Sequence, residues 1–379
     1  MDKETGKPTE RKDWLEEFSD RVKAQLEQNQ LDREKRAAER AKKKEKQENE
    51  QEAKKKKALA LQKKKKEEEE NSRKLEGILA RLPREKAKPG LVHGVLILEG
   101  GAYRGMYTAG VIDVLMENGI NFITTIGISA GGLCGLNYQS GQVGRGAYMN
   151  LKYRHSPSYV GLKAMMKENG FVGFQEMLYG EPMMDYPLDG KAFNNPKRHL
   201  YGVMTEVESG KACYPEITGA ENYVTAMHYI QASASLPIVS KPVLIQGKHY
   251  MDGGCSDPIP LDWAMKQKDG KKIVVIKTAP KGHRDSPRNP QIAGLMKTVF
   301  GKYKTFVDNV NGMDVPYNRC LDRLDELEKE GRVFLFQQEE KTEMVPFFEG
   351  NLEKLSSLYW SGRKQAEMLL PSLLEYLKK

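Results

Sequence analysis

Two units of strand, glycine-containing loop and helix constrain the fold of this chain more than any other feature. The apolar run 92–98 leads into a glycine-rich loop at 100–105 and then into a helical pattern. The run 122–126 leads directly into Gly127-Ile128-Ser129-Ala130-Gly131, and a second helical pattern follows. Buried strands that each feed a helix are typical of a parallel α/β sheet. The sequence therefore predicts an α/β fold with a mostly parallel central sheet.

The later segments predict a mixture of strands and helices. Residues 201–207 and 212–217 flank Ser209-Gly210 as a hairpin would. Further expected elements are a helix at 223–233, a strand at 243–250 with a turn at Gly247, and strands at 272–277 and 333–337. We expect a compact domain at 91–285 and a mainly helical C-terminal region at 286–379.

Residues 1–90 form a charged N-terminal extension with 28 Lys and Arg against 21 Asp and Glu, whereas residues 91–379 hold 33 against 31. Between 32 and 57 the only apolar residues are alanines, so the seam of a coiled coil is missing. This composition fits either a solvated helix or partial disorder. A stripe of leucine and isoleucine at 75–82 predicts a short helix that docks on the globular part and ends at Pro83.

Targeting and redox signals are weak. The charged start of the chain does not resemble a secretory signal, and no run of about 18 apolar residues occurs. The four cysteines are widely spaced, without a C-x-x-C pair. We therefore expect a cytoplasmic protein with free thiols, in possible peripheral contact with the inner face of the membrane.

Ser129 is the candidate nucleophile. A serine on a sharp turn between a strand and a helix projects its hydroxyl above the sheet, and small neighbours such as Gly127 and Gly131 let the turn close. The motif occurs by chance in on the order of one chain in ten, so the alternative is an ordinary tight turn.

The glycine-rich loop could expose backbone N–H groups to the oxyanion of an acyl-transfer reaction. Its residues are Gly100, Gly101, Ala102, Tyr103, Arg104 and Gly105. A Walker loop would need Gly-Lys-Ser/Thr where Gly105-Met106 stands, and a dinucleotide fingerprint would need glycine at position 102. A structural turn remains the other interpretation.

Asp252, in Asp252-Gly253-Gly254, is the candidate base that a serine nucleophile needs. The two glycines would let the backbone fold close to Ser129. We interpret all six histidines as structural or surface residues: His93, His155, His199, His228, His249 and His283. His283 is the strongest rival to Asp252.

In order along the chain, these three motifs resemble those of the patatin-like phospholipase family, in a bacterial branch with a helical C-terminal extension. The segment 232–237, Ala-Ser-Ala-Ser-Leu-Pro, is similar to the family's Ser-Ala-x-x-Pro segment. The resemblance implies a three-layer α/β/α fold and makes 91–285 the catalytic domain. It also implies a Ser–Asp dyad of Ser129 and Asp252, an oxyanion hole at 100–105 and no metal or organic cofactor. Ala102 departs from the third glycine of many members, and its N–H can still serve if φ stays negative.

The implied function is hydrolysis of lipid or fatty-acyl esters through an acyl-enzyme. The alternatives are an inert scaffold that uses the basic N-terminal arm, and an esterase of small esters or thioesters. The lysine runs of the arm could contact anionic membranes, but the arm lacks an apolar face and nearby glutamates cancel most of the field. Nucleic acid is an unlikely partner for the same reason of charge balance, and the sequence leaves the oligomeric state open. The methionine-containing stretch 165–184 is expected to form either a lid or pocket wall, or core packing.

Overall fold

The computed structural model describes residues 9–161, 164, 166–167 and 170–379, and its contacts divide the chain into two compact units, Met1–Lys74 and Leu75–Lys379. In the first unit, helix α1 (Thr9–Leu79) runs without interruption and continues into the second. Ion pairs four residues apart, such as Lys56–Glu52 at 2.8 Å and Lys74–Glu70 at 3.0 Å, lie along it. Each exposed pair contributes about 0.3–0.5 kcal/mol, so this part of the extension is a charged, solvated helix.

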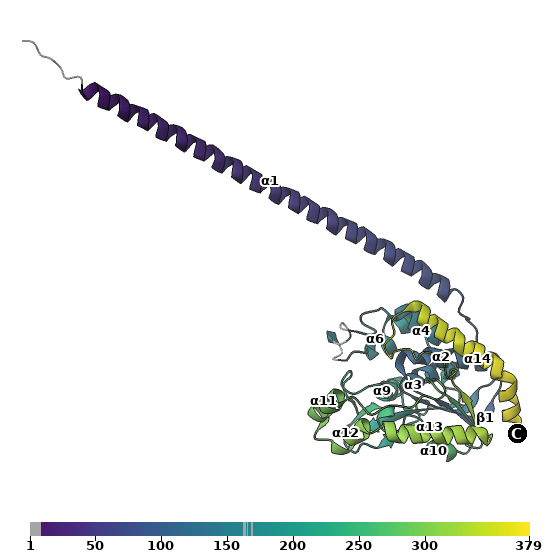
Figure 1. The fold of residues 1–379 in the computed structure, drawn as a ribbon. Coiled ribbons are helices and arrows are strands. Elements are labelled where there is room, and N and C mark those ends of the chain that lie inside the picture. Colours follow the sequence, from purple (N-terminus) through teal and green to yellow (C-terminus); the bar gives the residue numbers. More distant parts are fainter. Residues whose placement is uncertain (1–8, 162–163, 165, 168–169) are drawn as a thin grey trace, which may run out of the picture. The chain divides into compact units, whose positions relative to one another are not determined.

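The second unit is built on an eight-stranded sheet (Figure 1). Along the sheet the order is β5-β6-β3-β2-β1-β7-β8, and β4 pairs with β3 at the side of this path. The five strands from β3 to β8 in this order are parallel. In contrast, β4 and β6 each pair antiparallel with β3, and β5 pairs antiparallel with β6. The strands are β1 Val92–Leu98, β2 Phe122–Ile128, β3 His199–Glu206, β4 Ala212–Cys213, β5 Val243–Ile245, β6 Lys248–Asp252, β7 Ile273–Ile276 and β8 Val333–Phe336.

Helices cover both faces of the sheet. Between β1 and β6 the helices with described bounds are α2 Gly105–Glu117, α3 Ala130–Gln139, α4 Arg145–Tyr153, α6 Phe174–Tyr179, α7 Glu181–Asp185, α8 Gly190–Phe193 and α9 Tyr223–Ser233. After β6 follow α10 Leu261–Met265, α11 Pro290–Phe300, α12 Lys304–Asn311, α13 Asp314–Lys329 and α14 Leu352–Lys378. Short 3-10 turns occur at Ala102–Arg104 (η1) and Gly253–Cys255 (η2).

The side chains of β1 explain why its sequence is a continuous apolar run. Leu96 and Leu98 join the core beneath α2 and α14, while Val95 and Ile97 join the core beneath α10 and α13. Figure 1 shows these two pairs of helices on opposite sides of the sheet. A parallel strand that is buried on both faces has no solvent-exposed side, so its sequence is apolar at consecutive positions. The predicted three-layer fold with a mostly parallel sheet is confirmed.

The C-terminal region contributes to the same sheet. Its strand β8 pairs in parallel with β7, with Ile273 opposite Val333, and its helix α14 packs on α2. The predicted stripe at 75–82 is also packed here, since Ile78 and Leu82 are buried in the core beneath α2 and α14. The boundary expected at residue 285 remains a prediction. Within the part of the chain that the structure describes, none of the helices has the length and apolar character needed to cross a bilayer.

Candidate active site

Ser129 lies at the junction of β2 and α3 with an unusual backbone conformation, φ 55° and ψ −122°. A β-carbon on Gly127 would lie 2.4 Å from the carbonyl oxygen of Gly131, and one on Gly131 would lie 2.0 Å from that of Leu98. Both flanking positions therefore admit only glycine. A strained serine on a tight turn from strand to helix is the geometry of a nucleophile elbow.

Asp252 is held at the end of β6 beside β3, where Met204 is its partner in the sheet. Thr205 Oγ1 donates to the Asp252 carbonyl oxygen at 2.8 Å. The Gly254 N–H donates to Asp252 Oδ1 at 2.8 Å, and a β-carbon on Gly253 would lie 2.3 Å from the Val203 carbonyl oxygen. The Asp-Gly-Gly sequence thus brings the turn against β3 and orients the carboxylate.

The Asp252 carboxyl group is almost fully buried, at 2% exposure, and burial raises its pKa to about 6. The Ser129 hydroxyl and the Gly254 N–H act in the opposite direction and lower the pKa. Oδ2 forms no hydrogen bond with any described residue, although the Ser129 hydroxyl is among the groups that lower the pKa of this carboxyl. Such catalytic contacts often tighten only when substrate binds.

Three N–H groups of the glycine-rich loop are engaged within the protein. Tyr103 N–H donates to the Phe347 carbonyl at 3.0 Å, and Arg104 N–H donates to the Gly101 carbonyl at 3.0 Å. Gly105 N–H donates to the carbonyl groups of Ala102 and Tyr103. These three residues of the predicted oxyanion hole therefore have no free backbone donor.

The N–H groups of Gly100, Gly101 and Ala102 have no acceptor among the residues that the structure describes. A β-carbon on Gly100 would lie 3.1 Å from Ser129 Cβ, so this part of the loop lies against the serine. Ala102 has φ 48°, outside the negative range on which the sequence argument made its donor role conditional, but its N–H is still without an acceptor among the described residues. Ala130, which the sequence argument did not count as a donor, follows the serine at the free N-terminus of α3, where an oxyanion donor is expected.

A buried polar cluster supports the glycine-rich loop from behind. Glu99, at 5% exposure, accepts hydrogen bonds from Tyr317 Oη at 2.5 Å and from the Thr278 N–H at 2.6 Å. Thr278 Oγ1 in turn donates to the Gly100 carbonyl. The sequence argument did not find these residues. Glu99 and Thr278 carry only the local signal of a polar residue just after a buried strand, and Tyr317 lies in α13.

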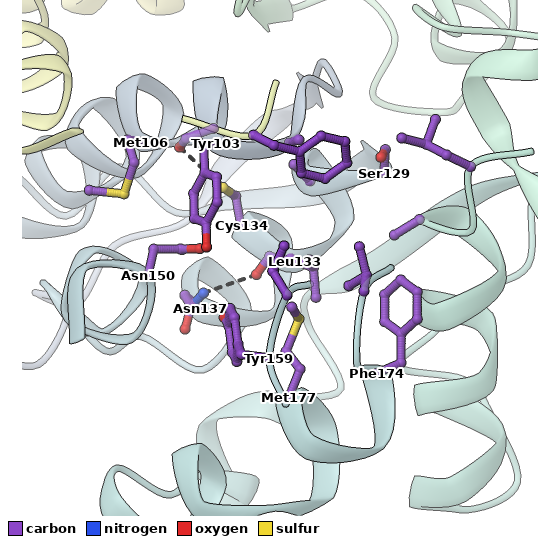
Figure 2. Close-up of a pocket in the computed structure, with 18 residues that line it drawn as sticks. Tyr103, Met106, Ser129, Leu133, Cys134, Asn137, Asn150, Tyr159, Phe174 and Met177 are labelled. Atoms are coloured by element: carbon purple, nitrogen blue, oxygen red, sulfur yellow. Dashed lines mark hydrogen bonds between the residues drawn. The ribbon is translucent and has the colours of Figure 1, made fainter. Parts of the chain in front are cut away.

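An apolar cavity of about 90 Å³ opens beside Ser129 (Figure 2), several times the space that one water molecule requires. Ser129 lies at one side of the lining and Tyr103 with Asn150 at the other. The lining consists of Ala102, Tyr103, Gly105, Met106, Ser129, Ala130, Leu133, Cys134, Asn137, Asn150, Tyr159, Val160, Val172, Phe174, Met177, Ala234, Leu236 and Phe348.

The methionines expected at this pocket divide into two groups. Met177 contributes to the lining, whereas Met166 and Met184 are exposed to solvent, at 78% and 75%. Met165 lies outside the described residues. The pocket-wall interpretation of 165–184 therefore applies to its middle, on α6.

Histidine side chains are not part of the pocket lining. Instead, His199 and His249 each lie 2.7 Å from a glutamate oxygen, and His283 lies 2.8 Å from Asp285. His283, the strongest sequence-based rival, thus pairs with its own loop. The Asp252 carboxyl and the free backbone N–H groups near Ser129 form an arrangement suited to acyl transfer without imidazole.

The chain is similar to known families and proteins over parts of its length. Residues 96–265 match the model of the patatin-like phospholipase family, and residues 303–378 match a domain of unknown function, DUF6363. The chain is 26% identical over 215 residues to the uncharacterized protein YjjU of Escherichia coli, a match that covers 54% of this chain and 56% of that protein. VipD from Legionella pneumophila is a structural match with a TM-score of 0.36 and 14% identity, over 77% of this chain and 70% of VipD. Residues 96–265 of the chain therefore form a patatin-like phospholipase domain.

Proposed function

We propose that this protein hydrolyses fatty-acyl esters of lipids, with Ser129 as nucleophile and Asp252 as general base. The observation that carries the proposal is the strained Ser129 elbow at an apolar pocket, beside a buried carboxyl whose pKa is raised to about 6. A base with a pKa near the working pH combines a usable ionised fraction with the strength to accept a proton.

The reaction runs in two steps. Ser129 Oγ attacks the ester carbonyl carbon while Asp252 takes the hydroxyl proton, and the resulting oxyanion is stabilised by the N–H groups of Gly101, Ala102 and Ala130. Collapse of the tetrahedral intermediate breaks the ester bond, and the proton passes from Asp252 to the leaving alkoxide. Water then attacks the acyl-enzyme with Asp252 again as base, which releases the fatty acid and restores Ser129.

The lining of the pocket supports a fatty-acyl substrate over a charged one. Its side chains are mostly apolar, from Leu133, Val172, Phe174, Met177 and Leu236 among others. Gly100 lies against Ser129, and Ala130 follows the serine at the start of α3. Binding of an acyl chain in such a cavity becomes more favourable by roughly 0.8 kcal/mol for each methylene group that is buried. Contact of the charged extension with a membrane, and a cytoplasmic location, remain predictions.

The test is turnover of p-nitrophenyl octanoate by the wild type, Ser129→Ala and Asp252→Asn, with Ser209→Ala as a matched control in the β3–β4 turn. We expect both site variants to lose at least about a thousandfold in kcat and the control to keep wild-type activity. Labelling with a fluorophosphonate should modify Ser129, as located by mass spectrometry. Full activity in folded Ser129→Ala would overturn the proposal.

The alternatives predict different results in the same assay. An inert scaffold would show no turnover and no labelling of Ser129. An esterase of small esters or thioesters would react through the same residues but would prefer an acetyl group to an octanoyl group. A preference for octanoate over acetate therefore separates the lipid assignment from its closest rival.

A further inference from the structure

The segment between β8 and α14 holds the glycine-rich loop from outside the patatin-like domain. Arg104 Nε donates to the Val345 carbonyl at 2.7 Å, and Tyr103 N–H donates to the Phe347 carbonyl at 3.0 Å. The Arg104 guanidinium also lies 4.0 Å from the centre of the Phe347 ring. Three contacts thus join residues 345–347 to η1, the turn that directly follows the free N–H groups.

The next residue in this segment, Phe348, reaches the pocket itself. Its side chain lines the cavity that contains Ser129, and it is 39% exposed, so it stands where the cavity meets solvent. Its ring packs edge-on against Phe171, with centroids 5.1 Å apart and planes at 74°. Phe171 is fixed in turn by the hydrogen bond from its N–H to the Val239 carbonyl at 2.6 Å.

We propose that residues 345–348, within the region of unknown function, complete the acyl-binding site: Phe348 forms its outer wall and selects for acyl-chain length, while Arg104 anchors the segment. The proposal rests on the proposed esterase function and adds a specificity determinant to it. An acyl chain that extends from Ser129 along the apolar lining meets Phe348 only when it is long enough. A short acyl group stays near the serine and does not meet it.

A purely structural role for Phe348 predicts a different pattern. In that case its removal would lower stability or kcat equally for every ester, because the glycine-rich loop would shift. A wall for the acyl chain contributes the same binding in ground state and transition state, so its loss raises KM and leaves kcat nearly unchanged. The dependence on chain length therefore separates the two roles.

The experiment compares Phe348→Ala, Phe348→Leu and Phe348→Tyr with the wild type on p-nitrophenyl butanoate, octanoate and dodecanoate. Val299→Ala, which truncates an exposed apolar side chain of α11, serves as control. We expect Phe348→Ala to raise KM for dodecanoate about tenfold, with a change in kcat below about threefold and little effect on butanoate. Phe348→Tyr keeps the aromatic ring, so its KM should depend on acyl-chain length as in the wild type.

A second readout does not depend on catalysis. The fluorescent fatty acid 11-(dansylamino)undecanoic acid is titrated into Ser129→Ala with and without Phe348→Ala, and we expect about tenfold weaker binding in the double variant. If esters are not hydrolysed but this loss occurs, the esterase proposal fails and the wall stands. The proposed role of Phe348 is refuted if Phe348→Ala and Phe348→Leu both leave probe affinity and the chain-length profile within about twofold of wild type. It is also refuted if both variants lower kcat/KM equally for all three esters.

Discussion

The backbone N–H of Ser129 donates a hydrogen bond to Ser233 Oγ at 3.2 Å, and the Ser233 side chain is fully buried. Two residues later, the Ser235 carbonyl accepts the N–H of Asp252 at 2.9 Å. The end of α9 thus contacts both members of the candidate dyad. A short stretch of chain sets the position of the elbow relative to the strand end that bears the carboxylate.

We predict that Ser233→Ala lowers kcat about 10- to 100-fold with little change in KM, because the Ser129 N–H loses its acceptor and the elbow can shift. Steady-state kinetics on the octanoyl ester measures this. The control is Ser140→Ala, which removes a comparable hydrogen bond, to the Asn137 carbonyl at 2.9 Å, at the far end of α3. Equal kcat values for the two variants would contradict a positioning role.

The pH dependence of activity should follow the Asp252 carboxyl. Burial raises its pKa to about 6, and only the ionised carboxylate can accept the Ser129 proton. The value of kcat/KM should therefore be constant above about pH 7 and fall as pH drops through about 6, approaching tenfold per pH unit below it. A pH–rate profile of the wild type, with folding followed by near-ultraviolet circular dichroism, measures this. A plateau that extends down to pH 4 would exclude Asp252 as the base.

The same carboxyl should weaken the fold at alkaline pH. Because its pKa in the folded state lies above the ordinary value of 3.8, protonation stabilises the folded state below about pH 4, and this contribution is lost as pH rises through about 6. Asp252→Asn keeps an oxygen for the Gly254 N–H and carries no charge. We expect it to be more stable than the wild type at pH 8 by on the order of 3 kcal/mol, with the difference vanishing near pH 4. Thermal unfolding at the two pH values measures the difference, and a less stable variant at pH 8 would contradict the expectation.

The elements that local patterns encode were predictable from the sequence. The apolar run 92–98 and the G-x-S-x-G turn each combine a strand, a glycine and a helix within a few residues, so spacing alone indicated β1, β2 and the elbow between β2 and α3. Asp252 followed from the same logic at the end of β6. The hairpin around Ser209-Gly210 also appeared as β3 and β4, because Gly210 adopts the positive φ, 70°, that such a turn needs.

The contacts that support the site could not be predicted, because they join residues far apart in the chain. Tyr317 reaches Glu99 from α13, and Phe347 reaches Tyr103 from the segment before α14. Neither partner carries a local signal, since a tyrosine in an amphipathic helix looks like any core residue. The free N–H donors could not be predicted either, because the loop sequence does not reveal that the N–H groups of Tyr103 and Arg104 donate to carbonyl groups within the protein.

The packing of α14 on α2 provides a sharp test of how the C-terminal region joins the sheet. A β-carbon on Gly110 would lie 2.1 Å from the Tyr359 carbonyl oxygen, and one on Gly362 would lie 2.2 Å from the Tyr107 carbonyl oxygen. The close contact between the two helices therefore depends on one glycine in each of them. Neither backbone can move away without opening the core between them.

We predict that Gly362→Ala destabilises the protein by about 3 kcal/mol, because the new methyl group forces α14 away from α2. Gly294→Ala is the matched control: Gly294 also lies inside a helix, α11, and a β-carbon there would meet nothing within 4 Å. Alanine is the better helix former, so this control should gain about 0.5–1 kcal/mol. Thermal unfolding of the two variants beside the wild type measures both changes. Equal midpoints for Gly362→Ala and the wild type would show that α14 does not pack on α2 at this distance.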